Sequence, residues 1–362
     1  MFVRGCLLVF LVATTAHAGR LVRVAGGGTE TENCAATSAK LTSPFGCDFD
    51  KAGNLYICEM TGERVLRVDP KGMLTILAGT GKKGSSGDGG PARMATFNGM
   101  HTLLVAPRPD GTGEVLYLAD TWNNRVRLLD LKTGQIDALA GTGKKGFSGD
   151  GGPAAKAEFD ELICLTRNFD GTKLYATDIR NRRIRAIDLK SGTVDTVAGN
   201  GKKGAPEEWA DARTSPLVDP RGACVDRKGN LYILERSGHV LRAVDPSGKL
   251  RTVVGTGKAG LGLGGGEVKK AQLNGPKHLC VDKDDNVIIA DTANHRILRY
   301  IPGKGKIELI AGTGKKGPSG DGGDALKTPL DEPHGVTVHR EGEREVLYIV
   351  DSLNHRVFRL EE

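Results

Sequence analysis

Clustered lysines in a recurring glycine-rich motif are the residues of this chain best suited to chemistry, because ammonium groups held close together attract anions. The motif Ala-Gly-Thr-Gly-Lys-Lys-Gly-x-Ser-Gly-Asp-Gly-Gly occupies residues 78–90, 140–152 and 311–323, and shorter copies occupy residues 198–204 and 255–260. The formal net charge of the 362-residue chain is +7, and nine lysines stand at this one repeat position. The excess positive charge is therefore concentrated there rather than spread along the chain. We predict an anion-binding surface formed by Lys82, Lys83, Lys144, Lys145, Lys202, Lys203, Lys315 and Lys316, with Lys258 at the matching place in the fifth copy.

The same motif could be taken for a phosphate or calcium site, but its pattern favours a structural turn. Phosphate loops open a helix and end in Gly-Lys-Ser/Thr, which these copies lack. A calcium loop needs several oxygen ligands, whereas each full copy supplies one Asp. A left-handed glycine turn closed by an Asp or Ser side chain fits the repetition better.

Short β-rich segments, repeated along the chain, must position these loops. One segment of each unit ends in an acid, and consecutive acids lie 56 to 61 residues apart: Glu59, Asp120, Asp178, Glu235, Asp291 and Asp351. One apolar segment precedes each of these and further ones follow, with Gly, Pro, Asn and Asp in the gaps, so each unit reads as four antiparallel strands. Six such units predict an all-β six-bladed propeller.

The sixth unit ends after its third strand, and a matching fourth strand lies at the other end of the chain. Residues 20–28 (RLVRVAGGG) match residues 73–81 (MLTILAGTG) of the first unit. We therefore expect residues 20–28 to form the outer strand of the last blade, which closes the ring without a free sheet edge. Residues 19–362 then form a single domain.

Residues 1–18 are predicted to be a signal peptide. A basic start, the apolar run Gly5–Thr15 and the small-x-small sequence Ala16-His17-Ala18 favour cleavage near Ala18. The apolar run is too short to span a bilayer. We expect a secreted or periplasmic protein that has no transmembrane segment and is a monomer.

Two motifs resemble the NHL-repeat family, and the glycine-rich loops look like those of its bacterial exported members. They are Asp-x-x-Asn-His-Arg at 291–296 and 351–356, and Pro-x-Gly-Val-x-Val at 333–338. The resemblance covers essentially the whole chain after residue 18 and implies a six-bladed propeller. It implies no single function, because the family contains binding domains as well as a few enzymes.

The head of each first strand is where the units differ most, and strand direction places it on the same face as the lysines. This position reads Phe45, Met100, Glu161, Arg221, Lys277 and His334, around the entrance to the central channel. We predict that Met100, Glu161, Arg221, Lys277 and His334 bind a ligand there, and the cationic members suit a small anion.

A metal-dependent lyase or hydrolase at the channel mouth is the alternative function. Among NHL-type proteins, the peptide-amidating lyase holds zinc with histidines from three blades in Pro-His-Gly-like contexts, and Pro333-His334-Gly335 is similar to that context. His101 and His278 stand one residue later than His334 in this alignment. Because neighbouring residues of a strand point to opposite sides, this register does not bring three imidazoles together to hold a metal. The sequence therefore assigns no catalytic residue and no cofactor, with His334 as a weak candidate ligand for zinc or calcium.

Six cysteines follow the predicted signal peptide. If Asp50 opposes Leu55 across the first turn, Cys47 opposes Cys58, and we predict a disulfide between them. Cys34 is then a free thiol or the true partner of one of the two. Cys164, Cys224 and Cys280 are placed at one repeat position and are expected to be buried small hydrophobic residues.

These patterns favour a binding or interaction module over an enzyme. The expected partner is a protein, an acidic glycan or another anionic envelope component. Few aromatic residues accompany the lysines, and an exported protein rarely meets nucleic acid, so a nucleic-acid partner is disfavoured.

Overall fold

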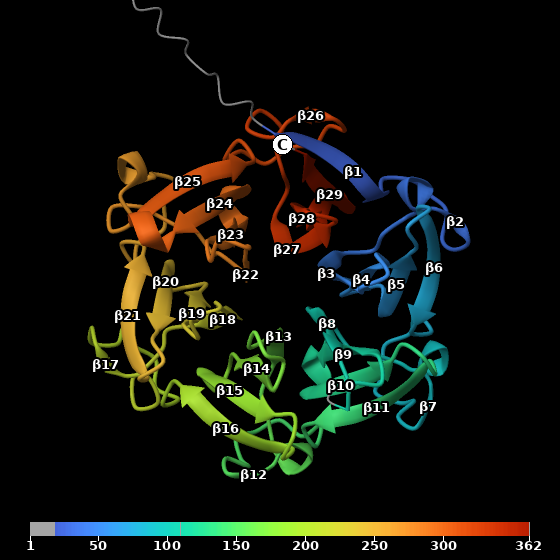
Figure 1. Cartoon of the computed structure of the whole chain (residues 1–362), viewed down its shortest axis with the longest axis horizontal. Coiled ribbons are helices and arrows are strands. Elements are labelled where there is room, and N and C mark those ends of the chain that lie inside the picture. The colour runs from blue at the N-terminus through green and yellow to red at the C-terminus, as the bar shows by residue number, and fades with distance from the viewer. Residues whose placement is uncertain (1–18, 109, 362) are drawn as a thin grey trace, which may run out of the picture.

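The computed structural model describes residues 19–108 and 110–361, and these form six antiparallel sheets arranged in a ring (Figure 1). The predicted six-bladed propeller is confirmed. The predicted signal peptide, residues 1–18, lies outside the described residues. Within the described ranges no helix is long and apolar enough to cross a membrane.

Each blade has four main strands, named here from the centre of the ring outward. Blades 1 to 3 contain β3 (Pro44–Phe49), β4 (Leu55–Glu59), β5 (Arg64–Val68) and β6 (Met73–Ala78); β8 (Leu103–Pro107), β9 (Glu114–Asp120), β10 (Arg125–Asp130) and β11 (Gln135–Ala140); and β13 (Leu162–Arg167), β14 (Lys173–Asp178), β15 (Arg183–Asp188) and β16 (Thr193–Ala198). Blades 4 to 6 contain β18 (Pro220–Val225), β19 (Leu231–Glu235), β20 (Val240–Val244) and β21 (Lys249–Val254); β22 (His278–Val281), β23 (Val287–Asp291), β24 (Arg296–Ile301) and β25 (Lys306–Ala311); and β27 (Pro333–Glu341), β28 (Arg344–Asp351), β29 (Arg356–Glu361) and β1 (Arg20–Gly26).

Five blades carry a short fifth strand that the sequence patterns did not predict. The two-residue strands are β2 (Cys34–Ala35), β7 (Gly90–Pro91), β12 (Gly152–Pro153), β17 (Ala210–Asp211) and β26 (Gly323–Asp324). Each belongs to the loop that arrives from the preceding blade, and it pairs with the outer main strand, as β7 does with β11. The ends of the glycine-rich motifs thus satisfy backbone groups on an otherwise open sheet edge.

The N-terminal strand closes the ring as predicted. Strand β1 pairs antiparallel with β29, so that Leu21 lies opposite Leu360, and the two ends of the described chain lie side by side in Figure 1. Leu21 has no exposed surface and packs in the same apolar cluster as Ile349 and Phe358. The last blade therefore depends on residues more than 300 positions away in the sequence.

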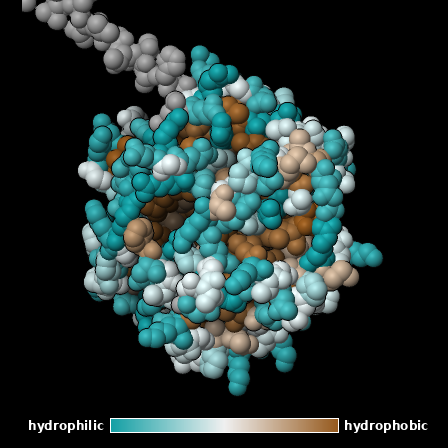
Figure 2. All heavy atoms as spheres, turned by 45° about the vertical axis from the view of Figure 1, so that its right-hand side comes forward, coloured by the Kyte–Doolittle hydropathy of each residue, from teal (hydrophilic) through white to brown (hydrophobic). Residues whose placement is uncertain are grey.

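The hydrophobic core lies between neighbouring blades. Tyr56 and Val65 of blade 1, for example, pack with Phe97 and Leu116 of blade 2. Because side chains alternate sides along a strand and both sides of each blade face a neighbour, the second strands are mostly apolar up to the acid that ends each of them, and β4 is buried at every position. Hydrophilic side chains cover most of the face seen in Figure 2, with apolar residues in its hollows.

The predicted Cys47–Cys58 disulfide is wrong, because the register differs by one residue. Phe49, rather than Asp50, lies opposite Leu55, so Cys47 pairs with Ile57. The connecting loop holds one more residue than expected, because the Asp50 carboxylate accepts hydrogen bonds from the backbone N–H and side-chain amide of Asn54. A one-residue shift turns a side chain to the other side of the sheet, and both thiols are free and buried.

Ring closure predicts equal costs for truncating two equivalent leucines. Leu21 of β1 and Leu74 of β6 have 0% and 1% exposed surface, at matching positions of two outer strands. Leu21→Ala and Leu74→Ala should each lower the free energy of unfolding by about 2–4 kcal/mol, measured by urea denaturation, because each leaves an apolar cavity. Met73→Ala, at a position that is 42% exposed, serves as the control. Loss of stability in Leu74→Ala but not in Leu21→Ala would show that β1 does not close the ring in solution.

Candidate functional site

A buried acid at the end of each second strand fixes the start of the first strand in the same blade. These six acids have no exposed surface. Each accepts a hydrogen bond from one backbone N–H, with N···O distances of 2.5–2.9 Å. The donors are Thr42, Asn98, Asp160, Val218, Asn274 and Asp331. Equivalent positions in the first strands of the six blades can therefore be numbered from these donor residues.

The third residue after each donor forms what we call the mouth ring. Its members are Phe45, His101, Ile163, Arg221, Lys277 and His334. Four of them are the residues predicted from the sequence for this position, whereas the prediction named Met100 and Glu161 in blades 2 and 3. The error arose because the other four blades carry a proline one residue earlier, whereas blades 2 and 3 have Met100 and Leu162 there, which hides the alignment.

The two misassigned residues have other environments. Met100 has no exposed surface and packs in the core between blades 1 and 2, so it is not available to a ligand. Glu161 lies two positions before the mouth ring with a positive φ of 55° and forms an ion pair with Arg180 at 2.9 Å. His101, which the sequence analysis had set one position out of register, takes the place of Met100.

Side chains from four consecutive blades pack against one another across the mouth. The Phe45 ring lies 5.0 Å from that of His101 and 4.0 Å from that of His334, measured between ring centroids. The Lys277 ammonium donates to His334 Nε2 at 2.7 Å and forms an ion pair with Glu332 at 3.3 Å. Phe45 and His334 are consequently buried, and this part of the mouth is filled by protein.

Both histidines of the ring are held neutral. Nδ1 of His334 bonds the Glu332 carbonyl oxygen at 2.7 Å, and burial together with the Lys277 charge holds the pKa of His334 well below its usual value. Burial and the Arg221 charge lower the pKa of His101 to about 3. The positive charge of the ring therefore resides on Arg221 and Lys277.

Arg221 is a buried cation that forms no ion pair, although the Asp219 and Glu161 carboxylates act on it from a distance. It is 5% exposed, and its guanidinium forms no hydrogen bond or ion pair with any other residue that the structure describes. Burial, with a contribution from Arg236, lowers its pKa to about 10. An unpaired buried charge is costly to a fold, so this group is a natural contact for an anion.

The lysines of the glycine-rich motifs are exposed on the same face as the mouth ring. The second lysine of three pairs reaches the head of the neighbouring blade: Lys145 pairs with Asp160 at 3.3 Å, Lys316 pairs with Asp331 at 3.4 Å, and Lys83 lies 5.4 Å from the centre of a Trp122 ring. The first lysine of each pair forms no ion pair among the described residues. Their ammonium groups are free to meet a partner.

The Asp of each full motif has a structural role. Asp88 bonds Arg125 and Arg127, both at 2.7 Å, while Asp150 pairs with Arg185 at 2.9 Å. Gly87 and Gly89 adopt the positive φ angles expected of a left-handed glycine turn. The carboxylates of these two copies tie the turns to the third strand of the next blade, whereas Asp321 of the third copy pairs with Arg23 of the outer strand β1 at 3.6 Å.

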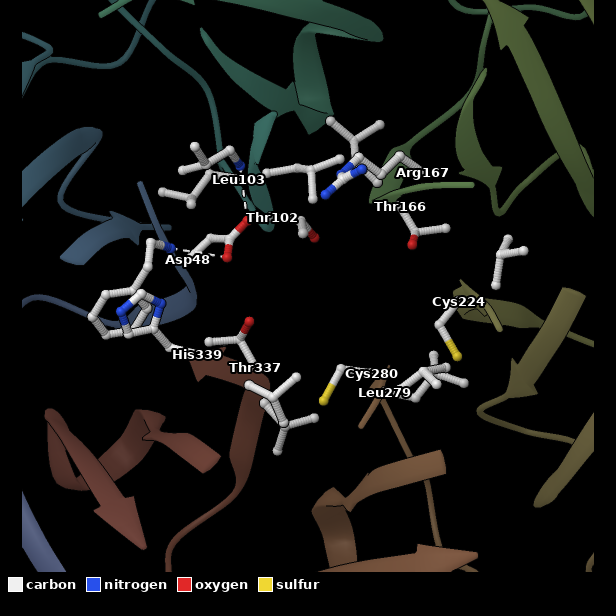
Figure 3. Close-up of a pocket in the computed structure, with 18 of the residues that line it drawn as sticks. Asp48, Thr102, Leu103, Thr166, Arg167, Cys224, Leu279, Cys280, Thr337 and His339 are labelled. Atoms are coloured by element: carbon white, nitrogen blue, oxygen red, sulfur yellow. Dashed lines mark hydrogen bonds between the residues drawn. The ribbon is translucent and has the colours of Figure 1, made fainter. Parts of the chain in front are cut away.

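A cavity of about 570 Å³, which the sequence analysis missed, occupies the channel beyond the mouth ring and opens at the opposite face (Figure 3). Its lining includes Asp48, Arg167, Cys280, Thr337 and His339. Burial raises the pKa of Asp48 to about 6. The equivalence of the cavity residues becomes visible when each first strand is numbered from the residue whose N–H bonds the buried acid. In this numbering Cys164 lies two positions before Cys224 and Cys280, although the sequence patterns had placed all three cysteines at one repeat position.

The described residues contain no group of three or more His, Cys, Asp or Glu side chains placed to hold a metal ion. His101 and His334 occupy the same ring position in blades 2 and 6, but Phe45 contacts both of them from blade 1.

Comparison with known proteins identifies the repeat. The NHL repeat model matches residues 273–300, which cover the first three strands of blade 5. NHL repeat-containing protein 2 of Homo sapiens is 24% identical over 333 residues, covering 84% of this chain and 44% of that protein. The chain is a six-bladed propeller that carries an NHL repeat.

The relatives of this NHL-repeat propeller are larger proteins. SUPPRESSOR OF QUENCHING 1 of Arabidopsis thaliana, a chloroplastic protein, is 26% identical over 276 residues, which are 73% of this chain and 25% of the relative. The chain thus spans less than half the length of these curated relatives.

Solved structures share the fold at low identity. An auxiliary nutrient binding protein from Bacteroides thetaiotaomicron matches with a TM-score of 0.65 and 15% identity, over 95% of this chain and 77% of that one. A streptogramin B lyase matches with a TM-score of 0.54 and 12% identity, over 96% of this chain and 99% of that one. Similarity at this level establishes the architecture alone.

The unpaired charge of Arg221 predicts that the NHL-repeat propeller gains stability when it is removed. Arg221→Met should raise the free energy of unfolding by about 1–3 kcal/mol, because an apolar side chain of similar size needs no counter-charge. Arg242→Met is the matched control, since Arg242 is equally buried but pairs with Glu235 at 2.7 Å. That control should lose about 3–5 kcal/mol. A loss of stability in Arg221→Met would contradict the assignment of Arg221 as an uncompensated charge.

Proposed function

We propose that this chain is a binding module that holds an anionic polymer, such as an acidic glycan of the cell envelope, on its lysine-bearing face. The observation that carries the proposal is the convergence of exposed lysines from five loops on one face around a basic mouth ring. Several weak contacts to a repeating anion add up, because the charges are spaced around a rigid ring. A secreted or periplasmic location, which residues 1–18 predict, would bring the protein to such a ligand.

The mouth ring would supply a stronger contact at the centre of this face. Arg221 and Lys277 offer positive charge in a dehydrated setting, where a charge-assisted hydrogen bond is stronger than at the surface. The rim acids Glu161 and Glu332 are already paired with Arg180 and Lys277. An anionic group that reaches the mouth would therefore meet a net positive environment.

A metal-dependent lyase or hydrolase is the second candidate, and one observation favours it. His101 and His334 stand at equivalent places in the mouth ring, and a streptogramin B lyase has the same fold. Against it, Lys277 already donates to the imidazole nitrogen of His334 that a metal would need. Metal analysis of the purified protein distinguishes the two functions, since one equivalent of zinc or calcium supports the enzyme.

The binding proposal predicts a face-specific loss of affinity for a polyanion. The triple variant Lys82→Gln, Lys144→Gln and Lys315→Gln should bind dextran sulfate at least about tenfold more weakly than the native protein, by isothermal titration calorimetry. The native affinity should also fall steeply between about 50 and about 200 mM salt, because binding releases counterions.

The control for this experiment removes the same charge from the opposite face. Lys71, Lys132 and Lys190 are exposed in the turns between the third and fourth strands of blades 1 to 3. Lys71→Gln, Lys132→Gln and Lys190→Gln together should leave the affinity unchanged. Equal losses in the two triple variants, or an affinity independent of salt, would overturn the proposal.

A further inference from the structure

The channel cavity on the face opposite the lysines has the size and the lining of a small-molecule site. Its volume of about 570 Å³ lies within the usual range for ligand pockets. It is bounded by the first strands of all six blades, and its opening is surrounded by turn residues such as Lys51 and Phe169 and by Arg340 near the end of β27. No residue of the mouth ring and no lysine of the glycine-rich motifs contributes to it.

At two positions of the first strands, each of which forms one level of the channel wall, a charged residue stands where the other blades carry neutral ones. The sixth residues after the bonded donors are Asp48, Leu104, Thr166, Cys224, Cys280 and Thr337. The seventh residues are Phe49, Val105, Arg167, Val225, Val281 and Val338. Asp48 is therefore the one acid in a level of neutral side chains, and Arg167 is the one charge in a level that is otherwise apolar.

Asp48 is held rigidly but keeps acceptor capacity. One carboxylate oxygen accepts the Val105 backbone N–H at 2.8 Å, and the other accepts the N–H of Phe49 at 2.9 Å. The Thr337 hydroxyl is a third hydrogen-bonding partner of this carboxylate, and no cation among the described residues forms an ion pair with it. The carboxylate can still accept a further hydrogen bond.

Arg167 extends along the cavity wall from blade 3 toward Asp48 of blade 1 (Figure 3). The only hydrogen bond of its side chain to a described residue is a long one, 3.4 Å, to the Phe169 carbonyl oxygen, and no described carboxylate pairs with it. Arg167 contributes to the electrostatic environment of Asp48, yet the two side chains do not form an ion pair. A space bounded by opposite charges thus lies between them.

We propose that this cavity binds a small zwitterion of amino-acid to dipeptide size. Its carboxylate would meet the Arg167 guanidinium and its ammonium group would meet the Asp48 carboxylate. The hydroxyls of Thr166 and Thr337 would take further hydrogen bonds, and the valine level would contact an apolar side chain. The site is separate from the polyanion surface, so each proposal stands or fails without the other.

The experiment uses a ligand series that removes one charge at a time. L-alanyl-L-alanine, its N-acetyl derivative, its C-terminal amide and free L-alanine are titrated into the whole protein by calorimetry. The dipeptide should bind with one site per chain, and blocking either terminus should weaken binding at least about tenfold. The free alanine arm distinguishes an amino-acid ligand from a peptide ligand.

Variants drawn from the repeat itself locate the two contacts. Arg167→Val introduces the residue found at this level in blades 2, 4, 5 and 6, and Asp48→Thr introduces the residue found in blades 3 and 6. Arg167→Val should bind the dipeptide and its amide equally, while Asp48→Thr should bind the dipeptide and its N-acetyl form equally. A merely structural role would weaken all ligands without removing this discrimination.

Two further variants control for charge and folding. Arg213→Val removes an exposed arginine outside the cavity and should leave binding unchanged. Arg167→Lys keeps the charge and should give an intermediate affinity, because it loses the two-pronged contact. Absence of dipeptide binding, binding that tolerates a blocked terminus, or discrimination that survives in both cavity variants would overturn the proposal.

Discussion

The hydrogen bond between a buried acid and the head of the innermost strand is the interaction on which the rest of the structure depends. Burial raises the pKa of Asp178 and Asp351 to about 6, so each carboxylate stays charged at neutral pH only because donors surround it. Asn181 and Asn354 supply side-chain N–H groups, and in other blades an arginine, such as Arg296 beside Asp291, adds a charge at 2.8 Å. Hydrogen bonds to a charged group contribute about 1.5–3 kcal/mol each. Leaving such an acid unpaired would cost more than the bonds contribute.

This interaction also sets the chemistry of the channel. Because the same N–H is held in every blade, the third residue after it always reaches the mouth ring, and the sixth and seventh always line the deeper channel. Most of these positions carry small or apolar residues that serve only packing. Arg221 and Lys277 at one level, and Asp48 and Arg167 at the others, are departures from that pattern. Lys277 is paired with Glu332, whereas Arg221, Asp48 and Arg167 form no ion pair among the described residues. A rigid ring that carries such charges is preorganised for binding, since the fold already meets the cost of holding them in place.

Much of the fold could be predicted from the sequence because its signals are local. The alternation of apolar segments, the repeated acids and the match between residues 20–28 and 73–81 predicted the blades and the closing strand. Strand direction was enough to group the lysines on one face. The short fifth strands were missed because a two-residue pairing leaves no periodicity to detect.

The site was harder to predict because it depends on single-residue registers. Asp50 and Asn54 close a loop one residue longer than expected, which separated Cys47 from Cys58. Blades 2 and 3 lack the proline that marks the strand head, which exchanged His101 for Met100. The channel cavity was not predicted because nothing in their own blades distinguishes Asp48 and Arg167. They differ from the residues at equivalent positions only when the six first strands are aligned by their hydrogen bonds to the buried acids.

The central claim is that unpaired charges at opposite ends of the channel form two independent sites. The most direct test is calorimetric titration of L-alanyl-L-alanine into the protein, first alone and then saturated with dextran sulfate. Our account predicts the same affinity and a one-to-one stoichiometry in both titrations, because the polymer occupies the face that the cavity does not open onto. Displacement of the dipeptide by the polymer would contradict it, since the two ligands would then share a single site.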